Sequence, residues 1–326
     1  MGSDAIALPA LNWLAGEGRQ IAELVAVFTR PDRATGRGHK VQSNEIKLWV
    51  KERGIPLHQP ERFDGDAQLQ LLALEPDLVL VMAYGHILKP DTIATPRLGT
   101  LNLHTSVLPK YRGASPIQTA IACGDTGTGV TLMRMVRQLD AGPVASVERV
   151  SIAPLDTAVE VGAKLAAACV PLLARCLPAI AAGKQAFTDQ SASHATYCRK
   201  LEKTDGVLDF ARPAALLAAR INGLMPWPGC AVKINGQAVK LGLAEACNVL
   251  IDKLPGPGEV AGSDAEGLLV GTGQGTLRLR KLQRPGGRML PAAEFLRGRP
   301  VAAGTRLPSH PMPALVADKP FPRPKG

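Results

Sequence analysis

The chain has 326 residues, of which 46% are hydrophobic and 20% are charged, and this composition excludes a disordered or fibrous protein. Its net charge is +10, and residues 205–326 hold 16 basic and 9 acidic side chains, which favours a polyanion or an acidic surface as partner. No uninterrupted apolar run approaches the roughly 18 residues of a membrane span, and no signal-peptide pattern opens the chain. We expect a two-domain cytoplasmic protein with no membrane partner.

Short apolar segments alternate with amphipathic ones over residues 8–175, which is typical of an α/β fold with a mostly parallel sheet covered on both faces. Strands are expected at residues 24–28, 78–82, 101–104 and 130–135. Helices are expected at residues 8–14, 45–52, 67–74 and 117–122. A longer helix should begin at a capping box formed by Thr157 and Glu160 and reach about residue 180.

The second half of the chain has a different pattern. Residues 184–204 are polar and weakly periodic, so we interpret them as a linker between a catalytic domain at 1–183 and a second domain at 205–308. Asn235 and Gly236 separate two alternating apolar segments and predict a hairpin, because both residues tolerate a positive φ. With further strands at 268–270 and 277–282, we predict a small β-barrel. Residues 309–326 contain 5 prolines and are predicted to be a disordered tail.

The metal-binding and redox residue types show no site pattern. The 6 cysteines include no Cys-x-x-Cys pair, and the histidines other than His104 lack metal-ligand spacing. This argues against a zinc centre, a redox centre and a disulfide framework. We expect reduced thiols and chemistry that requires no metal.

The most informative segment is the strand expected at residues 101–104. Strand side chains alternate between faces, so Asn102 and His104 point to one side, near the carboxyl end where open α/β sheets bind ligands. An amide and an imidazole placed together suit acyl transfer, because one can donate to a developing oxyanion and the other can accept a proton from an amine. Two polar residues on a half-exposed edge strand would give the same pattern, and spacing alone leaves both interpretations open.

Other charged residues have both a functional and an ordinary explanation. Asp140, in a glycine-containing loop, can orient an imidazole or take a proton, but acidic loop residues are more often solvated or capping. The basic, glycine-bearing loop at 29–40 matches neither a P-loop nor a dinucleotide fingerprint, so it is either a solvated loop or a phosphate contact. Arg278 and Arg280 share one strand face next to Lys281, as a phosphate-binding surface or as the ordinary charged exterior of a barrel.

Together these stretches resemble the methionyl-tRNA formyltransferase family over nearly the whole chain except the tail. In the first domain the matching stretches are Arg-Pro-Asp-Arg-Ala-Thr-Gly-Arg-Gly (30–38), Ala-Tyr-Gly (83–85), Asn-Leu-His (102–104), Ser-Val-Leu-Pro (106–109), Arg-Gly-Ala-Ser-Pro-Ile-Gln (112–118) and Leu-Asp (139–140). In the second domain they are Thr-Tyr-Cys-Arg-Lys-Leu-Glu (196–202), Pro-Trp-Pro (226–228) and Phe-Leu-Arg-Gly (295–298).

The resemblance implies a Rossmann-like formyltransferase domain followed by an OB-like barrel that contacts tRNA. The implied reaction moves the formyl group of 10-formyltetrahydrofolate to the α-amine of initiator methionyl-tRNA. Asn102 would polarise the formyl oxygen, His104 would assist proton removal and Asp140 would hold His104 or relay the proton. The remaining implied contacts are to folate from Ser106, Val107, Leu108 and Pro109, and to tRNA from Arg37, Arg278, Arg280 and Lys281.

Two alternatives stay open beside this interpretation. One keeps the folate chemistry but uses a sugar amine, another small amine or water as acceptor, and the charge of +7 over residues 205–326 disfavours it. The other is a catalytically impaired homologue that binds tRNA. By the resemblance, Met1 follows the family's first strand, so we expect an inner strand to be missing and an apolar segment to lie upstream. We also expect a monomer.

Overall fold

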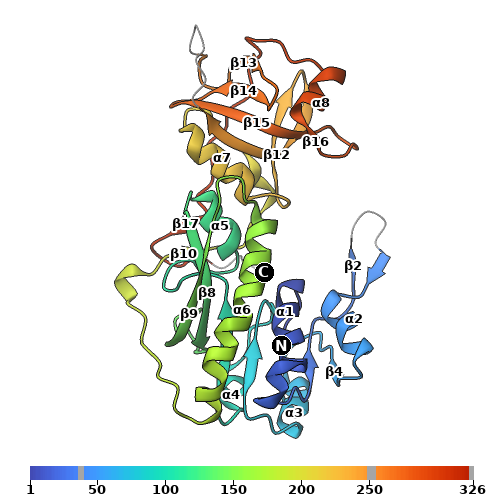
Figure 1. Cartoon of the computed structure of the whole chain (residues 1–326), viewed down its shortest axis with the longest axis vertical. Coiled ribbons are helices and arrows are strands. Elements are labelled where there is room, and N and C mark those ends of the chain that lie inside the picture. Colours follow the sequence, from blue (N-terminus) through green and yellow to red (C-terminus); the bar gives the residue numbers. More distant parts are fainter. Residues whose placement is uncertain (36–39, 248–254, 323–326) are drawn as a thin grey trace. The chain divides into compact units, whose positions relative to one another are not determined.

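The computed structural model describes residues 1–35, 40–247 and 255–322. It divides into two compact units that interleave along the chain (Figure 1). The first unit comprises Met1–Arg112, Gly129–Val150 and Gly162–Ala195, and the second comprises Gly113–Thr128, Ser151–Val161 and Thr196–Gly326. We describe each unit by itself, and the boundaries expected at 183, 204 and 308 stay a prediction.

The first unit is built on a sheet in the order β5–β6–β8–β9. These strands are β5 (Val79–Val81), β6 (Thr100–His104), β8 (Gly127–Arg134) and β9 (Val144–Ser151). β5 and β6 are parallel, but β6 and β8 are antiparallel, so the expected parallel arrangement covers only part of the sheet. A separate parallel pair joins β1 (Val27–Phe28) to β4 (Leu57–His58). The α/β fold expected for this half is confirmed.

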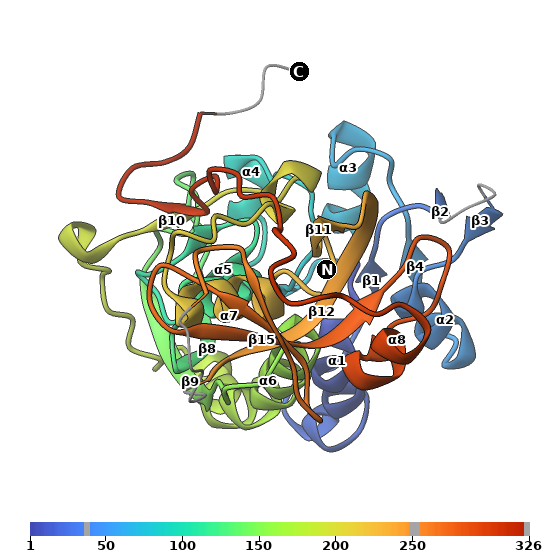
Figure 2. The same ribbon diagram turned by 90° about the horizontal axis from the view of Figure 1, so that it is seen from above.

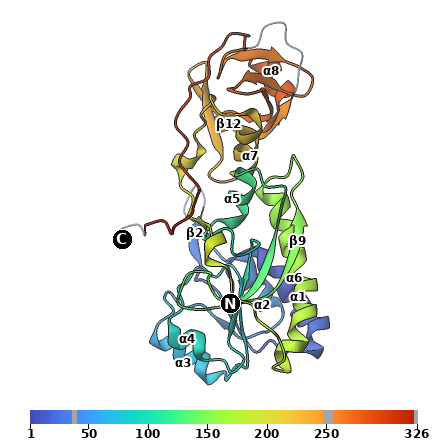
Figure 3. The same ribbon diagram turned by 90° about the vertical axis from the view of Figure 1, so that its left-hand side faces the viewer.

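Three helices of the first unit lie close to their expected positions, namely α1 (Leu8–Ala15), α2 (Glu45–Glu52) and α3 (Gly65–Ala73). The short helix α4 (Pro90–Ala94) is not among the expected ones, and Figure 3 labels both α3 and α4. At the start of α2 the side chain of Asn44 accepts a hydrogen bond from the backbone N–H of Lys47 at 2.9 Å, which caps the helix. Ile46 and Val50, four residues apart, are fully buried and anchor its inner face.

Helix α6 (Ala158–Ala181) runs alongside β8 and β9 in Figure 1. By length and composition it is apolar enough to cross a membrane, a property that a search for uninterrupted apolar runs misses. Its Val161, Leu165 and Leu172 are fully buried, so α6 is a core helix. One half of the expected capping box forms at its start, where the Thr157 backbone N–H donates to the Glu160 carboxylate, while the Thr157 hydroxyl accepts from the backbone N–H of Val159.

Between β1 and β5 lies a cavity of about 410 Å³, which we call the strand slot. Apolar residues dominate its lining, including Ala10, Leu14, Val27, Val79 and Leu103. Residues 1–3 bridge one end of it: Gly2 donates to the Phe28 carbonyl at 3.0 Å, and Ser3 donates to the Ala83 carbonyl at 3.2 Å. The Met1 ammonium donates to Leu80 at 2.7 Å, and burial lowers the pKa of this group to about 5.

The second unit contains a curled antiparallel sheet in the order β11–β12–β15–β14–β13, with β16 paired to β15. Figure 1 labels β12 to β16, and Figure 2 labels β11 beside β12. Its strands are β11 (Cys230–Ile234), β12 (Gln237–Cys247), β13 (Val260–Ser263), β14 (Leu268–Gly271), β15 (Thr276–Gln283) and β16 (Leu290–Pro291). The register between β12 and β15 shifts near Gly242. Such irregularities bend a strand and help a sheet to curl. Within the described residues β11 and β13 do not pair, so the expected barrel is an open half-barrel.

The expected turn of this unit is present, and a helix precedes its sheet in the chain. Asn235 and Gly236 have φ values of 48° and 79°, as a tight hairpin between twisted strands requires. Helix α7 (Ala214–Gly223) packs against α5 (Pro116–Ala122), and a Cβ at Gly223 would lie 2.6 Å from the backbone nitrogen of Ala122. This close approach explains the glycine at the end of α7.

The tail prediction is wrong for the described residues after 308. β17 (Val316–Ala317) pairs antiparallel with β10 (Tyr197–Cys198), and Leu315 is buried in the core of the second unit. Proline lacks a backbone N–H donor, but the residues between the prolines can still pair as a strand and bury the side chain of Leu315. The remaining elements are β2 (Arg33–Thr35), β3 (Lys40–Gln42), β7 (Arg112–Gly113), α8 (Ala292–Gly298) and the 3₁₀ helices Ala5–Ala7, Glu17–Gln20, Ala192–His194 and Lys203–Gly206.

Candidate active site

Strand β6 positions the first two candidate residues. Leu101 and Leu103 are 0% and 2% exposed and anchor the strand in the core. Asn102 and His104 occupy the alternate positions, which places them on one face of the sheet. His104 is buried and Asn102 is half-buried. Among the described residues, none forms a hydrogen bond to the side-chain amide of Asn102. Its two N–H donors are therefore available to a ligand.

The imidazole of His104 is held by the backbone of Tyr111. Its Nε2 lies 3.0 Å from the carbonyl oxygen of Tyr111, and both groups are buried. A carbonyl oxygen can only accept, so Nε2 must carry the hydrogen of this bond. In the neutral ring Nδ1 is then the basic nitrogen. Tyr111 has a φ of 58°, in the left-handed region that favours glycine, so the surrounding fold enforces this carbonyl direction.

Asp140 lies next to the basic nitrogen of His104. Its Oδ2 is 3.7 Å from Nδ1, too long for a hydrogen bond but close enough to attract a protonated ring, and the two side chains are only 15% and 6% exposed. Asp140 also has a positive φ, 47°. The loop after it packs tightly, since a Cβ at Gly142 would lie 1.9 Å from the carbonyl oxygen of Arg134. The structure thus brings the histidine and the carboxylate together.

The stretch assigned to folate is divided between buried and accessible residues. The Ser106 hydroxyl is fully buried and donates to the Lys110 carbonyl at 2.6 Å, so it shapes the turn. Leu108 is also buried, and its backbone N–H donates to the Thr131 hydroxyl at 3.1 Å. Val107 and Pro109 are half-buried and are the two residues of the stretch whose side chains reach the surface.

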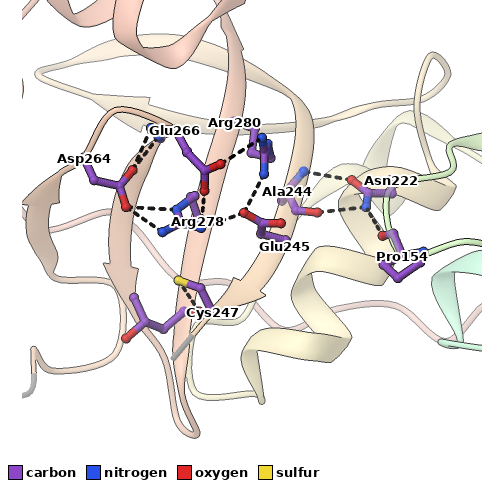
Figure 4. Close-up of polar contacts among 11 residues, drawn as sticks. Pro154, Asn222, Ala244, Glu245, Cys247, Asp264, Glu266, Arg278 and Arg280 are labelled. Atoms are coloured by element: carbon purple, nitrogen blue, oxygen red, sulfur yellow. Dashed lines mark hydrogen bonds and ion pairs between the residues drawn. The ribbon is translucent and has the colours of Figure 1, made fainter. Parts of the chain in front are cut away.

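The arginines assigned to tRNA phosphates are engaged within the protein (Figure 4). Arg278 forms ion pairs of 2.8, 2.6 and 2.8 Å with Glu245, Asp264 and Glu266. Arg280 pairs with Glu245 at 2.7 Å and with Glu266 at 3.6 Å. Hydrogen bonds from Arg278 and Arg280 outweigh the effect of burial and lower the pKa of the Glu245 carboxyl.

These pairs change the expected tRNA surface. Arg278 and Arg280 do share one face of β15, with Leu277 and Leu279 fully buried on the other. Their charge is nevertheless balanced by Glu245 on the neighbouring strand β12 and by Asp264 and Glu266 in the turn between β13 and β14, and the sequence does not reveal how these elements are placed beside β15. Lys281 is exposed, and Arg37 lies outside the described residues. Lys281 is therefore the assigned residue on β15 that is best placed for an external phosphate.

The structure adds residues that the sequence did not single out. Gln190, in the stretch interpreted as a linker, donates to the carbonyls of Asp140 and Gly142 at 2.9 and 2.7 Å. Arg112 in turn donates to the side-chain oxygen of Gln190. The motif at 112–118 marks Arg112 in the sequence, but nothing there links it to a residue 78 positions away.

Among the described residues there is no group of three or more His, Cys, Asp or Glu that could hold a metal ion. The six cysteines are free thiols.

Comparisons with known proteins bear on the family of the chain. Residues 7–177 match the family model described as Formyl transferase, and residues 200–300 match Formyl transferase, C-terminal domain. The methionyl-tRNA formyltransferase of Ectopseudomonas mendocina (strain ymp) is 40% identical over 278 residues, covering 85% of this chain and 87% of that protein. That of Burkholderia ambifaria (strain MC40-6) is 40% identical over 290 residues, covering 86% and 88%.

Among solved structures, the sugar 3N-formyl transferase WlaRD has a TM-score of 0.66 at 16% identity, covering 88% of this chain and 97% of that one. At this identity the likeness shows the fold alone. The two relatives share far more of the sequence and match across both units, in keeping with the expected motifs. The chain therefore belongs to the methionyl-tRNA formyltransferase family.

Proposed function

We propose that this protein transfers the formyl group of 10-formyltetrahydrofolate to the α-amine of methionine on initiator tRNA, the modification used in translation initiation. One observation carries the proposal. The amide of Asn102, which has no hydrogen-bond partner among the described residues, shares a strand face with His104, whose basic Nδ1 lies 3.7 Å from Asp140. A donor for an oxyanion and a base backed by a carboxylate are the groups that acyl transfer to an amine requires.

The proposed reaction uses each group once. The neutral methionyl amine attacks the formyl carbon, and the Asn102 amide donates to the formyl oxygen as negative charge develops there. Nδ1 of His104 accepts the proton that the amine nitrogen loses, and the carboxylate of Asp140 stabilises the imidazolium. The bond between the formyl carbon and N10 of the folate then breaks, and the proton passes to N10. The products are formylmethionyl-tRNA and tetrahydrofolate.

Apolar surface beside His104 and Asp140 suits a folate ring. Val107 and Pro109 are half-buried at the end of β6, and Leu139, next to Asp140 in the chain, is 62% exposed. We assign the folate contact to these side chains. Ser106 and Leu108 hold the shape of the turn from within.

For the tRNA we assign phosphate contacts to Lys281 and to the basic loop that contains Arg37. Exposed cations that follow Lys281 in the sequence are assigned to the same role, namely Arg284, Arg288 and Arg297. Initiator methionyl-tRNA is the proposed partner, the cytoplasm the proposed location and a monomer the proposed state.

The decisive assay mixes the purified protein with 10-formyltetrahydrofolate and charged initiator tRNA and measures formylmethionine released after deacylation. Formylation of the charged tRNA supports the proposal. Formylation of a nucleotide-linked amino sugar with the charged tRNA unused would replace it with the sugar-amine reaction. Tight tRNA binding without turnover would identify a catalytically impaired homologue.

A further inference from the structure

Residues 185–190, near the end of the first unit, run along the loop that carries Asp140. Thr188 and Val144 exchange two backbone hydrogen bonds of 2.9 and 2.8 Å. The side chain of Gln185 donates to the Ala145 carbonyl at 3.2 Å. A stretch of weak periodicity is therefore attached to the start of β9 by several bonds. Its last contact with the loop comes from Gln190.

The amide of Gln190 is fully used. Its Nε2 donates one hydrogen to the Asp140 carbonyl at 2.9 Å and the other to the Gly142 carbonyl at 2.7 Å. Its Oε1 accepts from Nε and Nη2 of Arg112 at 3.1 and 2.8 Å. The opposite amide orientation would set Nε2 against the arginine donors and Oε1 against two carbonyls, so the chemistry of the neighbours fixes this orientation.

The loop needs such external bonds. Asp140 is held at a φ of 47°, in the left-handed region that a non-glycine residue adopts only at a cost in free energy. Gln190 grips the carbonyls on both sides of Ala141, so it restrains the backbone that directs the Asp140 carboxylate. A restraint at these two atoms sets where Oδ2 lies relative to Nδ1 of His104.

The other end of this chain of bonds leads back to His104. Arg112 is 6% exposed and follows Tyr111, whose carbonyl accepts from Nε2 of His104. One dipeptide, Tyr111-Arg112, thus holds the histidine directly and the aspartate through Gln190. The positions of His104 and Asp140 therefore both depend on this dipeptide.

We propose that Gln190 is a positioning residue, which aligns Asp140 with His104 through the carbonyls of Asp140 and Gly142 and is itself oriented by Arg112. The inference rests on the proposed function, which gives His104 and Asp140 their roles. Gln190 does not touch the reacting atoms, so its removal acts on the rate of the chemical step rather than on the binding of either substrate.

The test compares Gln190→Met with Gln185→Met. Both substitutions keep the length of the side chain and remove an amide that donates to backbone carbonyls of the same segment, but only Gln190 reaches the Asp140 loop. We expect Gln190→Met to lower kcat by about tenfold to a hundredfold, with KM for both substrates changed less than about twofold, because a small misplacement of catalytic groups is costly. Gln185→Met should stay within about twofold of the unchanged protein in kcat.

A second measurement does not depend on activity. With ¹⁵N-labelled histidine, the imidazole resonances of His104 should shift in Gln190→Met and stay in place in Gln185→Met. Equal kcat in the two variants, or unchanged His104 resonances in Gln190→Met, would overturn the positioning role. An unchanged protein that fails to formylate charged tRNA would instead reject the proposed function, and the resonances would still report whether Gln190 aligns the dyad.

Discussion

The carbonyl of Tyr111 lies 3.0 Å from Nε2 of His104 and thereby decides which nitrogen of the ring is basic. Because Nε2 carries the hydrogen of that bond, Nδ1 is the nitrogen that can take a proton, and it is also the one that lies near Asp140. The backbone at residue 111 thus selects the tautomer that the proposed reaction needs. This assignment leads to the first prediction.

Replacing the imidazole should remove the base. We expect His104→Ala to lower kcat about 10²–10⁴-fold, the usual contribution of general acid–base catalysis, with a much smaller effect on KM. Initial rates of formylation at varied tRNA and folate concentrations provide the measurement. His310→Ala, which changes an exposed histidine of the second unit, is the matched control. Comparable rates for His104→Ala and the control would refute the role of the ring.

The amide of Asn102 should act on the oxyanion. Asn102→Ala is expected to lower kcat by about 10²–10³, or about 2.7–4 kcal/mol, as for other oxyanion donors. Asn102→Asp has nearly the same shape but no N–H to donate when ionised, so it should fail to restore the rate. Recovery of most of the activity by Asn102→Asp would show that side-chain shape, rather than hydrogen-bond donation, is what matters here.

Arg278 and Lys281 should behave differently although both lie on β15. Arg278→Met leaves Asp264 without its cation and Glu245 with Arg280 alone, so we expect a loss of about 1–3 kcal/mol in the free energy of unfolding, measured in urea. Lys281→Ala should leave stability unchanged and should reduce by about 0.9 the slope of log affinity for tRNA against log salt concentration. The reverse pattern would mean that Arg278 leaves its carboxylates to bind phosphate.

The buried Met1 ammonium predicts a pH dependence of stability. Its pKa falls from 8.0 to about 5 on folding, so between these values the unfolded chain holds a proton that the folded chain has lost. Stability should therefore fall as the pH drops from 8 toward 5, by up to about 4 kcal/mol for this group. Urea unfolding measured across this pH range tests the slope.

An N-terminal extension separates the effect of the buried amine from the effect of the unfilled apolar space in the strand slot. Five apolar β-forming residues added before Met1 convert the amine to an amide and fill apolar space, so they should abolish this slope and raise Tm. Five residues of glycine and serine should abolish the slope without the gain in Tm. Equal pH dependence in all three proteins would contradict the burial of the ammonium.

Much of the fold is legible in the sequence because local signals and tertiary packing agree. The buried alternation of residues 101–104, the Asn235-Gly236 turn and the periodicity of α2 each predict an element within one or two residues of its bounds. β9 was missed, since its side chains are half-buried and lack a clear alternation. The pairing of β17 with β10 depends on residues about 120 positions apart, which no local pattern encodes.

The site likewise has a part that the sequence predicts and a part that only the structure shows. Asn102 and His104 follow from a two-residue period on one strand. The approach of Asp140, the bond from Tyr111 and the grip of Gln190 require knowledge of how separate loops fold back on the sheet end. The pairing of Arg278 with carboxylates depends on how neighbouring strands and turns are placed. From the order of charged residues alone, Arg278 and Arg280 were expected to be free to bind phosphate. Contacts between distant segments therefore account for most of what the sequence left open.

Among the residues described, β1 and β5 are joined by residues 1–3 and by side-chain packing but do not pair with each other as strands, so the two parts of the first unit are expected to open separately. Amide hydrogens of the β1–β4 pair, such as that of Val27 bonded to Pro56, should exchange with solvent through a local opening, while those of β6 should wait for global unfolding. The chain would then present a protease with an early cleavage region near its beginning, well before the half that carries Asn102 and His104 gives way.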